Sequence, residues 1–442
     1  MPGYTRSPTE AMSAHVKTIR HRIATLADYH AEAGLTSIHH HLDKWWLAEA
    51  YHQLGNGKAP GIDGVTKAKY GEKLNASLDQ LVDRVRSRDY KAPPVKRVDI
   101  PKGNGETRPL GLPTLEDKVL QKAVVMLIEP VFEREFHDFS YGFRPGRRPH
   151  DAVRSLHRAV GGEGLHWVID LDLRKYFDTI PHQPLREMFR HRIRDGVLNQ
   201  LILGWLKAGA LHEGQMQASR EGTPQGGIIS PLLANRYLHE ALDEWFVHEL
   251  QPHLKGRARM VRYADDAVMC FSCQADAEET LRALHERMAA YGLSLHPEKT
   301  RRLDFRPAAA KSDRKAGSFS FLGFCYHWGR SRKGRPTVQV KTAKERLTSK
   351  LKELKQWLRA NRHLGLKEQH ARFSMKLHGH LNYYGVSYNS RSLNQFVWEA
   401  TRWWRYWLNR RNRKGDWPWK RFWSYLAEHP LPKVRIVHSL FD

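Results

Sequence analysis

Two adjacent aspartates, Asp265 and Asp266, stand between apolar runs in "VRYADDAVMCF" (261–271). Strands usually exclude Asp, and neighbouring like charges repel each other. A second pair, Asp170 and Asp172 in "HWVIDLDL", shares one face if this segment is a strand, because strand side chains alternate. If the two segments lie side by side, the carboxylates converge and repel one another unless a metal ion neutralises them. Hard oxygen ligands of this kind favour Mg²⁺.

Two such ions would activate an attacking hydroxyl and stabilise a leaving pyrophosphate oxygen. The alternative is that Asp265 and Asp266 only form a turn, as Asp often does, and an isolated Asp-Asp pair favours that alternative. Three other features favour the metal site. They are the strand that carries Asp172, the Gln-Gly loop "GTPQGGIISP" (222–231) and a basic loop at 102–108.

The composition describes a folded and strongly basic protein. Among 442 residues, 73 Lys and Arg side chains outnumber 47 Asp and Glu side chains, which gives a net charge of +26. A hydrophobic fraction of 40% is enough for well-formed cores, and the length suits two or three domains. A charge this large exceeds what solubility needs and indicates a polyanionic partner.

Only three cysteines occur, which excludes a disulfide framework and fits a reducing compartment. Cys270 and Cys273 have a C-x-x-C spacing but lack the second pair of a zinc site, and the histidines at 39–41 fit a solvated helix face better than a metal site. No apolar run reaches membrane-spanning length, and there is no signal-peptide core. We therefore expect a soluble, cytoplasmic protein of the prokaryotic cytosol or nucleoid that binds no membrane.

The elements that must position these residues are helical at both ends of the chain and mixed in between. Residues 1–54 look helical, and 55–64 form a Gly/Pro loop. Residues 95–100 alternate as a strand, and 101–109 are typical of a basic hairpin turn. From residue 165 short strands alternate with helices, which predicts an α+β fold.

Helix boundaries are marked by capping residues. Thr114 with Asp117 resembles a capping box that opens a long helix, which Pro130 should interrupt. Ser230 and Pro231 suit the N-cap and the first position of another helix.

A hairpin is predicted at 259–272, and residues 319–328 form either another strand or a hairpin. The helix that follows residue 272 should pack under the sheet. The apolar positions of that helix are Leu281, Leu284, Met288 and Tyr291. After residue 340 the chain is helical and basic, with one apolar face formed by Leu347, Leu351, Leu354 and Leu358.

These motifs carry a resemblance to a known family. "YADD" in an apolar hairpin, preceded by "DLRKYFD" and "GTPQGGIISPLLAN", resembles the palm of a reverse transcriptase. The ordered set "APGIDG", "RPLGLP", "YGFRPGR", "PQGGIISPLLAN", "YADD" and "FLGF" resembles the group II intron reverse transcriptase/maturase family. The likeness is dense over residues 50–325 and extends more weakly to "HGHLNYYG" (378–385).

The resemblance implies an α+β right-hand polymerase whose fingers and palm, an antiparallel sheet with helices, precede an α-helical thumb. The implied parts are an N-terminal helical extension (1–54), fingers (55–165), a catalytic palm (166–335), a helical thumb/maturase domain (336–395) and a basic Trp/Arg-rich nucleic-acid-binding segment (396–442). The implied activity is RNA-directed DNA polymerisation with two Mg²⁺ ions, for which Mn²⁺ could substitute. The implied partners are an RNA template, a DNA primer, dNTPs, structured group II intron RNA and target DNA.

Family roles transfer to matching positions. Asp172 and Asp265 would bind both metal ions with the backbone carbonyl of Leu173, and Asp266 would support the metal site or the primer end. Asp170 precedes the motif, so it is either a supporting or a surface residue.

Lys102 and Arg108 would clamp the incoming triphosphate, although a surface hairpin would also contain such charges. Gln225 and Gly226 would line the nucleotide pocket, or else form a flexible turn. Lys299 could reach the triphosphate as a general acid, or it could simply face solvent.

Phe177 would exclude a ribose 2′-hydroxyl and so select deoxynucleotides. Alternatively, Phe177 is an aromatic residue of the core, packed beside Tyr176 and Ile180. The primer strand would be held by Phe321, Leu322, Gly323 and Phe324. Alternatively, these four residues form a strand of the core.

The last segment interleaves Trp with Arg, so it could stack on unpaired bases or form a small helical core with outward Arg residues. Many intron-encoded relatives end in a Cys/His-rich nuclease domain, and we expect that activity to be absent here. Two alternative functions remain open, which are a free-standing reverse transcriptase of DNA repair or antiphage defence and a splicing-only RNA-binding maturase.

Overall fold

A four-stranded antiparallel sheet brings the two carboxylate-bearing segments side by side. In the computed structural model its strands run in the order β6–β7–β3–β8. Their bounds are β6 Ala258–Tyr263, β7 Asp266–Phe271, β3 Trp167–Leu171 and β8 Arg301–Asp304. Asp170 on β3 lies opposite Val268 of β7 on one side and opposite Arg301 of β8 on the other. The hairpin predicted at 259–272 is confirmed.

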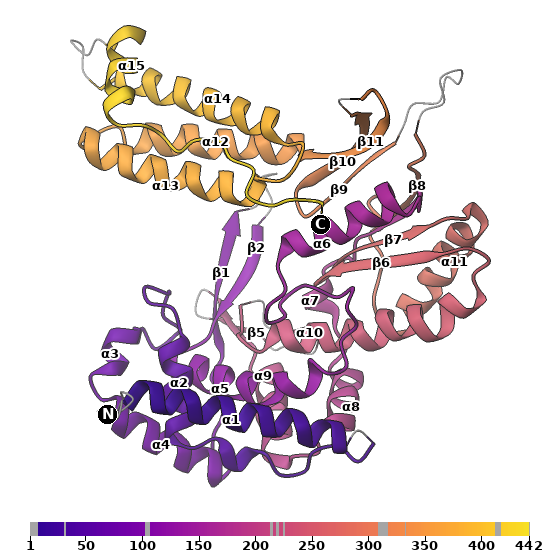
Figure 1. Cartoon of the computed structure of the whole chain (residues 1–442). Helices are drawn as coiled ribbons and strands as arrows, with labels where there is room; N and C mark the ends of the chain where they lie inside the picture. Colours follow the sequence, from indigo (N-terminus) through magenta and orange to yellow (C-terminus); the bar gives the residue numbers. More distant parts are fainter. Residues whose placement is uncertain are drawn as a thin grey trace, which may run out of the picture.

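Helical regions precede and follow this sheet in the chain (Figure 1). An N-terminal helical lobe lies at one end, a C-terminal helical bundle lies at the other, and the sheets lie between them. The mixture of helices and mainly antiparallel sheets agrees with the predicted α+β class. The structure describes residues 8–30, 32–101, 107–212, 215–217, 221–223, 226–307, 317–331, 333–411 and 417–441.

The two faces of β3 belong to different cores. Trp167, Ile169 and Leu171 join the large core on the side of helix α11 (Gln274–Ala290), as their alternation predicts. Val168 joins a second core with the strands that follow residue 317. Helix α11 buries Leu284, Met288 and neighbouring residues against the sheet, which confirms its predicted packing.

The N-terminal lobe is built around a nearly completely buried helix, α5. Its elements are α1 Pro8–Tyr29, the 3₁₀ turn η1 His39–His41, α2 Lys44–Gln53, α3 Lys67–Gly71, α4 Leu74–Arg86 and α5 Leu115–Phe132. Thr114 caps α5 by accepting a hydrogen bond from the Asp117 amide at 3.3 Å, as expected. The predicted interruption at Pro130 is wrong, because Pro130 lies in the last turn, where its missing N–H costs a single backbone hydrogen bond.

A long hairpin rises from this lobe toward the C-terminal bundle (Figure 1). It consists of β1 Val95–Pro101 and β2 Thr107–Leu112, which confirms the predicted strand and its antiparallel return, whereas residues 102–106 of the predicted turn lie outside the described residues. β4 Ala210–His212 and β5 Gln215–Gln217 extend the same sheet on the β1 side.

Apart from β4 and β5, the described segment between β3 and β6 is mainly helical and includes two π-helical turns. It comprises α7 Tyr176–Thr179, α8 His182–Arg192, α9 Gly196–Lys207, α10 Ser230–Leu238, the π-helical turns η3 His239–Asp243 and η4 Trp245–Leu250, and the 3₁₀ turn η5 Gln251–His253. Helix α10 begins at Ser230 with Ile229 at the N-cap, so the helix starts one residue earlier than predicted.

A three-stranded meander covers the second core. Its strands are β9 Ser318–Phe321, β10 Phe324–Arg330 and β11 Pro336–Thr342, in the order β11–β10–β9. The helix α6 Pro149–His157 and the π-helical turn η2 Arg158–Gly162 pack against the same core. Of the strand or hairpin expected at 319–328, the structure has the hairpin.

The C-terminal bundle consists of α12 Lys344–Ala360, α13 Leu366–Tyr384, α14 Ser390–Leu408 and α15 Trp419–Glu428. Leu354, Leu358 and Trp404 are buried in its core, whereas Trp398 and Trp423 are 49% and 44% exposed. The small helical core is therefore present, and stacking of the exposed Trp residues on bases stays a prediction. Among the described residues, no helix combines the length and apolarity that crossing a membrane would require.

Candidate active site

The backbone directly after β3 is fixed by the segment that leads into β8. The Asp172 carbonyl accepts hydrogen bonds from the His296 amide at 2.8 Å and the Thr300 hydroxyl at 3.0 Å. Leu173 is buried and forms an antiparallel bridge with Leu295. These contacts set the position of Asp172 without using its carboxylate, which is directed into a cavity.

The second pair of carboxylates sits on a tight two-residue turn. Ala264 and Asp265 join β6 to β7, with Tyr263 paired to Asp266. Ala264 has a φ of 58°, in the left-handed region that such hairpin turns require and that glycine normally supplies. A non-glycine residue in this region costs about 1–3 kcal/mol and persists only where its surroundings fix it.

A buried ion pair braces this turn from behind. Arg262 and Asp243 are both fully buried, and the Arg262 guanidinium binds both carboxylate oxygens of Asp243. The guanidinium also donates to the Ala264 carbonyl at 3.0 Å and to Asn235 Oδ1 at 3.1 Å. A side chain at Gly142 would collide with the Ala264 amide, so a glycine is needed where this loop packs against the turn.

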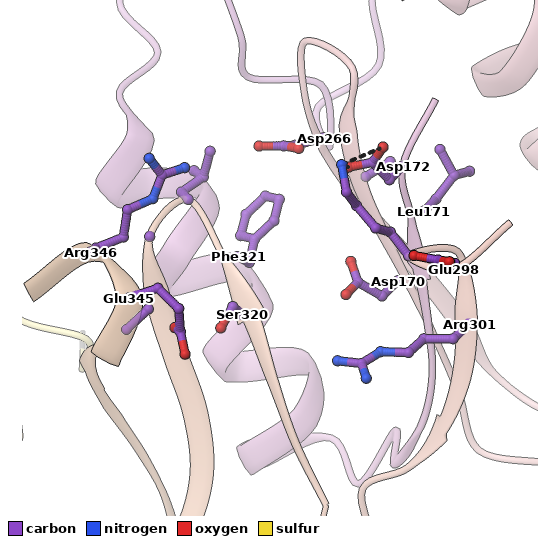
Figure 2. A pocket seen from close by; sticks show the side chains of 15 residues that line it. Asp170, Leu171, Asp172, Asp266, Glu298, Arg301, Ser320, Phe321, Glu345 and Arg346 are labelled. Carbon is purple, nitrogen blue, oxygen red and sulfur yellow. Dashed lines mark hydrogen bonds and ion pairs between the residues drawn. The ribbon is translucent and has the colours of Figure 1, made fainter. Parts of the chain in front are cut away.

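The carboxylates open onto a cavity of about 450 Å³ (Figure 2). Asp170, Asp172 and Asp266 point into it from β3 and β7. The residues lining the cavity are Asp170, Leu171, Asp172, Asp266, Ala267, Glu298, Lys299, Arg301, Ser320, Phe321, Leu322, Gly323, Ala343, Glu345 and Arg346. Asp265 is not among them, so of the predicted triad only Asp172 and Asp266 reach this space.

Burial and mutual repulsion make two of these carboxyls reluctant to ionise. Removal from water raises the pKa of Asp266 to about 6, and the charges of the three neighbouring aspartates raise it as well. Burial also raises the pKa of Asp170 to about 6, where Arg301 opposes the shift and Asp172 adds to it. A cation in the cavity would stabilise both ionised forms.

The pKa of Asp265 is affected by a charge on the β1–β2 hairpin. Burial raises the pKa of Asp265, and the charge of Arg108 on β2 opposes that rise, so Arg108 lies within electrostatic reach of the turn. Lys102 and Gln225, which the sequence assigns to the nucleotide site, lie outside the described residues.

Lys299 lies at the cavity, where its Nζ is 3.4 Å from Asp172 Oδ2. The side chain of Lys299 is 60% exposed, so this single pair is a weak constraint. The ammonium group therefore faces the carboxylates rather than solvent alone.

Phe177 packs against the large core, with its ring edge-to-face on Tyr176 at 5.5 Å, so its alternative as a core aromatic is also compatible with the structure. Its ring is half-buried, whereas Tyr176 and Ile180 are fully enclosed. Gly226 has a φ of 110°, and a side chain there would collide with the Gly111 carbonyl of β2. The Gln-Gly loop therefore passes close to the basic hairpin at this point.

The turn between β9 and β10 forms the opposite wall of the cavity (Figure 2). Leu322 and Gly323 have φ values of 52° and 81°, which is the geometry of a type I′ hairpin. Tyr383 of α13 donates a hydrogen bond to the Leu322 carbonyl at 3.0 Å, so the turn is tied to the C-terminal bundle. Phe321 and Phe324 are buried in the second core, as the alternative for these residues predicts.

The donor set around Asp172 fits a hard divalent ion. All the donors are carboxylate oxygens, and the raised pKa values of Asp265 and Asp266 mark a place where positive charge would be favourable. Within the described ranges, these aspartates do not form a group of three ligand atoms within 4.8 Å of one another. The fit therefore rests on donor chemistry and charge rather than on a closed ligand cage.

Sequence reasoning missed three arginines that shape this site. Arg262 braces the turn, Arg301 pairs with Asp170 across the sheet, and the charge of Arg346 favours the ionised form of Asp266. Arg262 could have been suspected, because a charged residue in an apolar strand needs a buried partner. Arg346 belongs to α12, and no sequence pattern links that helix to the carboxylates.

Known proteins resemble the central part of the chain. Residues 100–326, just over half of its length, match the family model "Reverse transcriptase (RNA-dependent DNA polymerase)". Protein YkfC of Escherichia coli K12 is 42% identical over 224 residues, which cover 49% of this chain and 58% of that protein. Group II intron-encoded protein LtrA of Lactococcus lactis subsp. cremoris is 38% identical over 203 residues, which cover 46% of this chain and 33% of LtrA. The chain thus spans less than two thirds of each of these curated relatives.

Proposed function

The chain belongs to the reverse transcriptase family, among its group II intron reverse transcriptase/maturase members, and we propose that it extends a primer as an RNA-directed DNA polymerase. The observation that carries this proposal is the braced turn, whose Asp266 shares a cavity with Asp172 and whose Asp265 lies within electrostatic reach of both. Paired carboxylates on a strained turn serve no packing purpose and suit the binding of cations.

Reverse transcriptase domains generally use divalent metal ions, and we assign two Mg²⁺ ions to this site, with Mn²⁺ as a possible substitute. Asp172, Asp265 and the backbone carbonyl of Leu173 would hold them, and Asp266 would support the site through its charge. When bound, these ions would lower the pKa of the attacking 3′-hydroxyl and stabilise the leaving pyrophosphate.

The remaining roles belong to basic and shape-determining residues. Arg108, with Lys102 on the same hairpin, would bind the triphosphate of the incoming nucleotide, since its charge already acts on Asp265. Lys299 would protonate the leaving pyrophosphate from its place beside Asp172.

Nucleotide selection would fall to residues on the other side of the site. Phe177 would exclude a ribose 2′-hydroxyl, and its half-buried ring leaves one face available for that contact. Gln225 and Gly226 would line the nucleotide pocket, and the Leu322–Gly323 turn with Phe321 would hold the primer strand.

We propose that the predicted parts act as in a right-hand polymerase. The parts are a helical extension (1–54), fingers (55–165), palm (166–335), thumb/maturase domain (336–395) and a basic C-terminal segment (396–442). The contact between Tyr383 and the Leu322 turn would let the thumb respond to the position of the primer.

A second function, binding of structured intron RNA, is favoured by an exposed aromatic surface. The rings of Trp398 and Trp419 are parallel within 6° at 5.9 Å, and Trp423 stacks on Trp419 at 5.5 Å. Arg405 lies over the Trp419 ring at 4.2 Å. Such stacks bind unpaired bases, and basic groups beside them bind phosphates.

Primer extension tests the polymerase proposal. With an RNA template, a DNA primer, dNTPs and Mg²⁺, the full chain should synthesise DNA, and EDTA should abolish synthesis. Absence of extension under these conditions would contradict the proposal.

Sequencing of the RNA that copurifies with the chain would test its role in the intron. A structured group II intron RNA supports the maturase function. Its absence favours a free-standing enzyme of DNA repair or antiphage defence, and intron RNA without polymerase activity favours a splicing-only maturase.

A further inference from the structure

Three potential metal ligands that do not line the cavity converge at the helix that carries Asp243. His137 Nε2 lies 2.7 Å from Glu244 Oε1, and His248 Nε2 lies 3.5 Å from Glu244 Oε2. Their ligand atoms all lie within 4.8 Å of one another, and across the described part of the chain no other group of three has this property. The cluster is separate from the catalytic carboxylates, none of which belongs to it.

A fourth candidate, His239, faces the same place. Its Nε2 lies 3.4 Å from Glu244 Oε1, and its side chain is 4% exposed. Its other nitrogen, Nδ1, is buried without a hydrogen-bond partner and faces Asp243 Oδ2 at 3.7 Å. A carboxylate behind one ring nitrogen, with the other nitrogen directed at the site, is how proteins orient metal-binding histidines.

The local winding of the helix brings these residues together. His239–Asp243 and Trp245–Leu250 are π-helical, and π turns are rare and occur most often at functional sites. In an α-helix, residues five apart point in different directions, whereas the wider π turn brings His239 and Glu244 to the same side. His248, four residues beyond Glu244, lies on that side as well.

We propose that His137, His239, Glu244 and His248 bind a structural Zn²⁺ ion. Imidazole nitrogens with one carboxylate form a typical Zn²⁺ ligand set, whereas Mg²⁺ prefers oxygen ligands alone. Zn–N and Zn–O distances of about 2.0–2.1 Å place tetrahedral ligand atoms roughly 3.3 Å apart. The separations of His239 from Glu244 Oε1 (3.4 Å) and of His248 from Glu244 Oε2 (3.5 Å) are close to that value. His137 is at hydrogen-bond distance from Glu244 Oε1, 2.7 Å, and would move apart from it when both bind the ion.

The ion would brace the Ala264–Asp265 turn from a second direction. His137 opens the loop that pairs with β6, where the Arg262 amide donates to the Phe139 carbonyl at 2.9 Å. The Tyr141 amide donates back to the Arg262 carbonyl at 2.8 Å. A metal ion that joins His137 to the π-helical turns would hold this loop, and with it Gly142, against Ala264.

Zn²⁺ titration of the full chain tests the proposal directly. The purified protein is stripped with a chelator, dialysed and titrated with Zn²⁺ in a calorimeter. His248→Ala and Glu244→Gln remove ligands, and His248 is 65% exposed, so its loss leaves the core intact. His285→Ala, at an exposed position of α11, is the matched control.

We expect one tight Zn²⁺ per chain in the wild type and in His285→Ala. In both ligand variants the affinity should fall by more than the roughly 10- to 100-fold that changing an outer-shell partner costs. Zn²⁺ should also raise the thermal unfolding midpoint of the wild type and the control, but not of the ligand variants. The same Zn²⁺ affinity in all four proteins, or no tight binding to the wild type, would overturn the assignment. Neither readout needs polymerase activity, so failure here is distinct from failure of the proposed function.

Discussion

At the scale of single residues, the site holds carboxylates close together against their own repulsion. Burial and neighbouring charges raise the pKa values of Asp170 and Asp266 to about 6, above the ordinary value of 3.8. Ionising them in the folded protein is therefore less favourable than in the unfolded chain. This loss of stability arises at a place where a bound cation would reverse it.

Replacing Asp266 should therefore stabilise the metal-free protein. A carboxyl with a raised pKa binds its proton more tightly in the folded state, so its contribution to stability is lost as pH rises from about 4 through about 6. In EDTA at pH 7.5, Asp266→Asn should have a higher thermal unfolding midpoint than the wild type, and the difference should shrink at pH 5.

A suitable control for that experiment is Asp138→Asn. The pKa of Asp138 is lowered by its hydrogen bond and ion pair with Arg147, so this change should not stabilise the protein at pH 7.5. If Asp266→Asn lowered the midpoint in EDTA at that pH, the repulsion inferred here would be wrong.

Phe177 provides a second test at this scale, because its proposed role depends on bulk. Phe177→Ala should increase incorporation of ribonucleotides relative to deoxynucleotides by roughly 10- to 200-fold, the range that changes of shape in a pocket produce. Competing incorporation of labelled rNTP and dNTP measures the ratio. Phe177→Tyr keeps the bulk and should leave selectivity unchanged, and an unaltered ratio in Phe177→Ala would assign Phe177 to packing alone.

The residues that could be predicted are those whose motifs carry chemistry on their own. Asp172, Asp265 and Asp266 follow from two short motifs, and the structure brings them within electrostatic reach of one another. Arg262 and Asp243 lie in different elements, and their pairing depends on how α10 and its π-helical extension pass behind the sheet. No local pattern reports such a contact.

At the scale of elements, the Ala264–Asp265 turn depends on its neighbours. Ala264 occupies a backbone region that favours glycine, and the guanidinium of Arg262 holds its carbonyl. The turn is therefore positioned by a buried ion pair rather than by its own sequence preference.

Breaking this ion pair should affect stability and activity differently. Arg262→Met leaves Asp243 buried without a partner, which should cost about 3–5 kcal/mol of unfolding free energy. The double variant Arg262→Met with Asp243→Leu should recover much of that stability, because it removes the unpaired charge. Urea unfolding measures the first effect.

The rate of single-turnover nucleotide addition measures the effect of these substitutions on activity. It should stay low in the double variant, since the Ala264 carbonyl still lacks its donor. A double variant that regained the full rate would show that the brace serves folding alone.

Hairpins and amphipathic helices were the elements best predicted from sequence, because their signals are local. The strand pairing of β1–β2, β6–β7 and β9–β10 follows from apolar alternation around turn residues. The π-helical turns were not predicted, because their residues have no distinguishing composition and their geometry depends on tertiary contacts. Pro130 was misjudged because its effect depends on distance from the helix end.

At the scale of the whole molecule, the excess of positive charge fits the proposed polyanionic partner. The net charge is +26, and the C-terminal bundle adds an exposed stack of Trp residues beside Arg side chains. Composition predicted this class of partner, whereas the arrangement of the lobes around the cavity depends on long-range packing that composition does not specify.

Binding to an RNA–DNA hybrid should therefore depend steeply on salt. If six to ten phosphates are contacted, affinity should fall by about 10³- to 10⁵-fold between 50 and 200 mM salt. Fluorescence anisotropy with a labelled hybrid at increasing KCl measures the slope. A nearly flat dependence would indicate that the charge serves another purpose.

We propose that polymerisation depends on the carboxylates of the braced turn. Single-nucleotide addition to a DNA primer on an RNA template with Mg²⁺ should be compared in the wild type, Asp265→Asn and Asp138→Asn. Asp265→Asn should react at least about 10³-fold more slowly, because several kcal/mol of transition-state stabilisation would be lost. Asp138, whose side chain is 96% exposed and does not line the cavity, should be replaceable without effect. Equal rates in Asp265→Asn and the wild type would contradict the account.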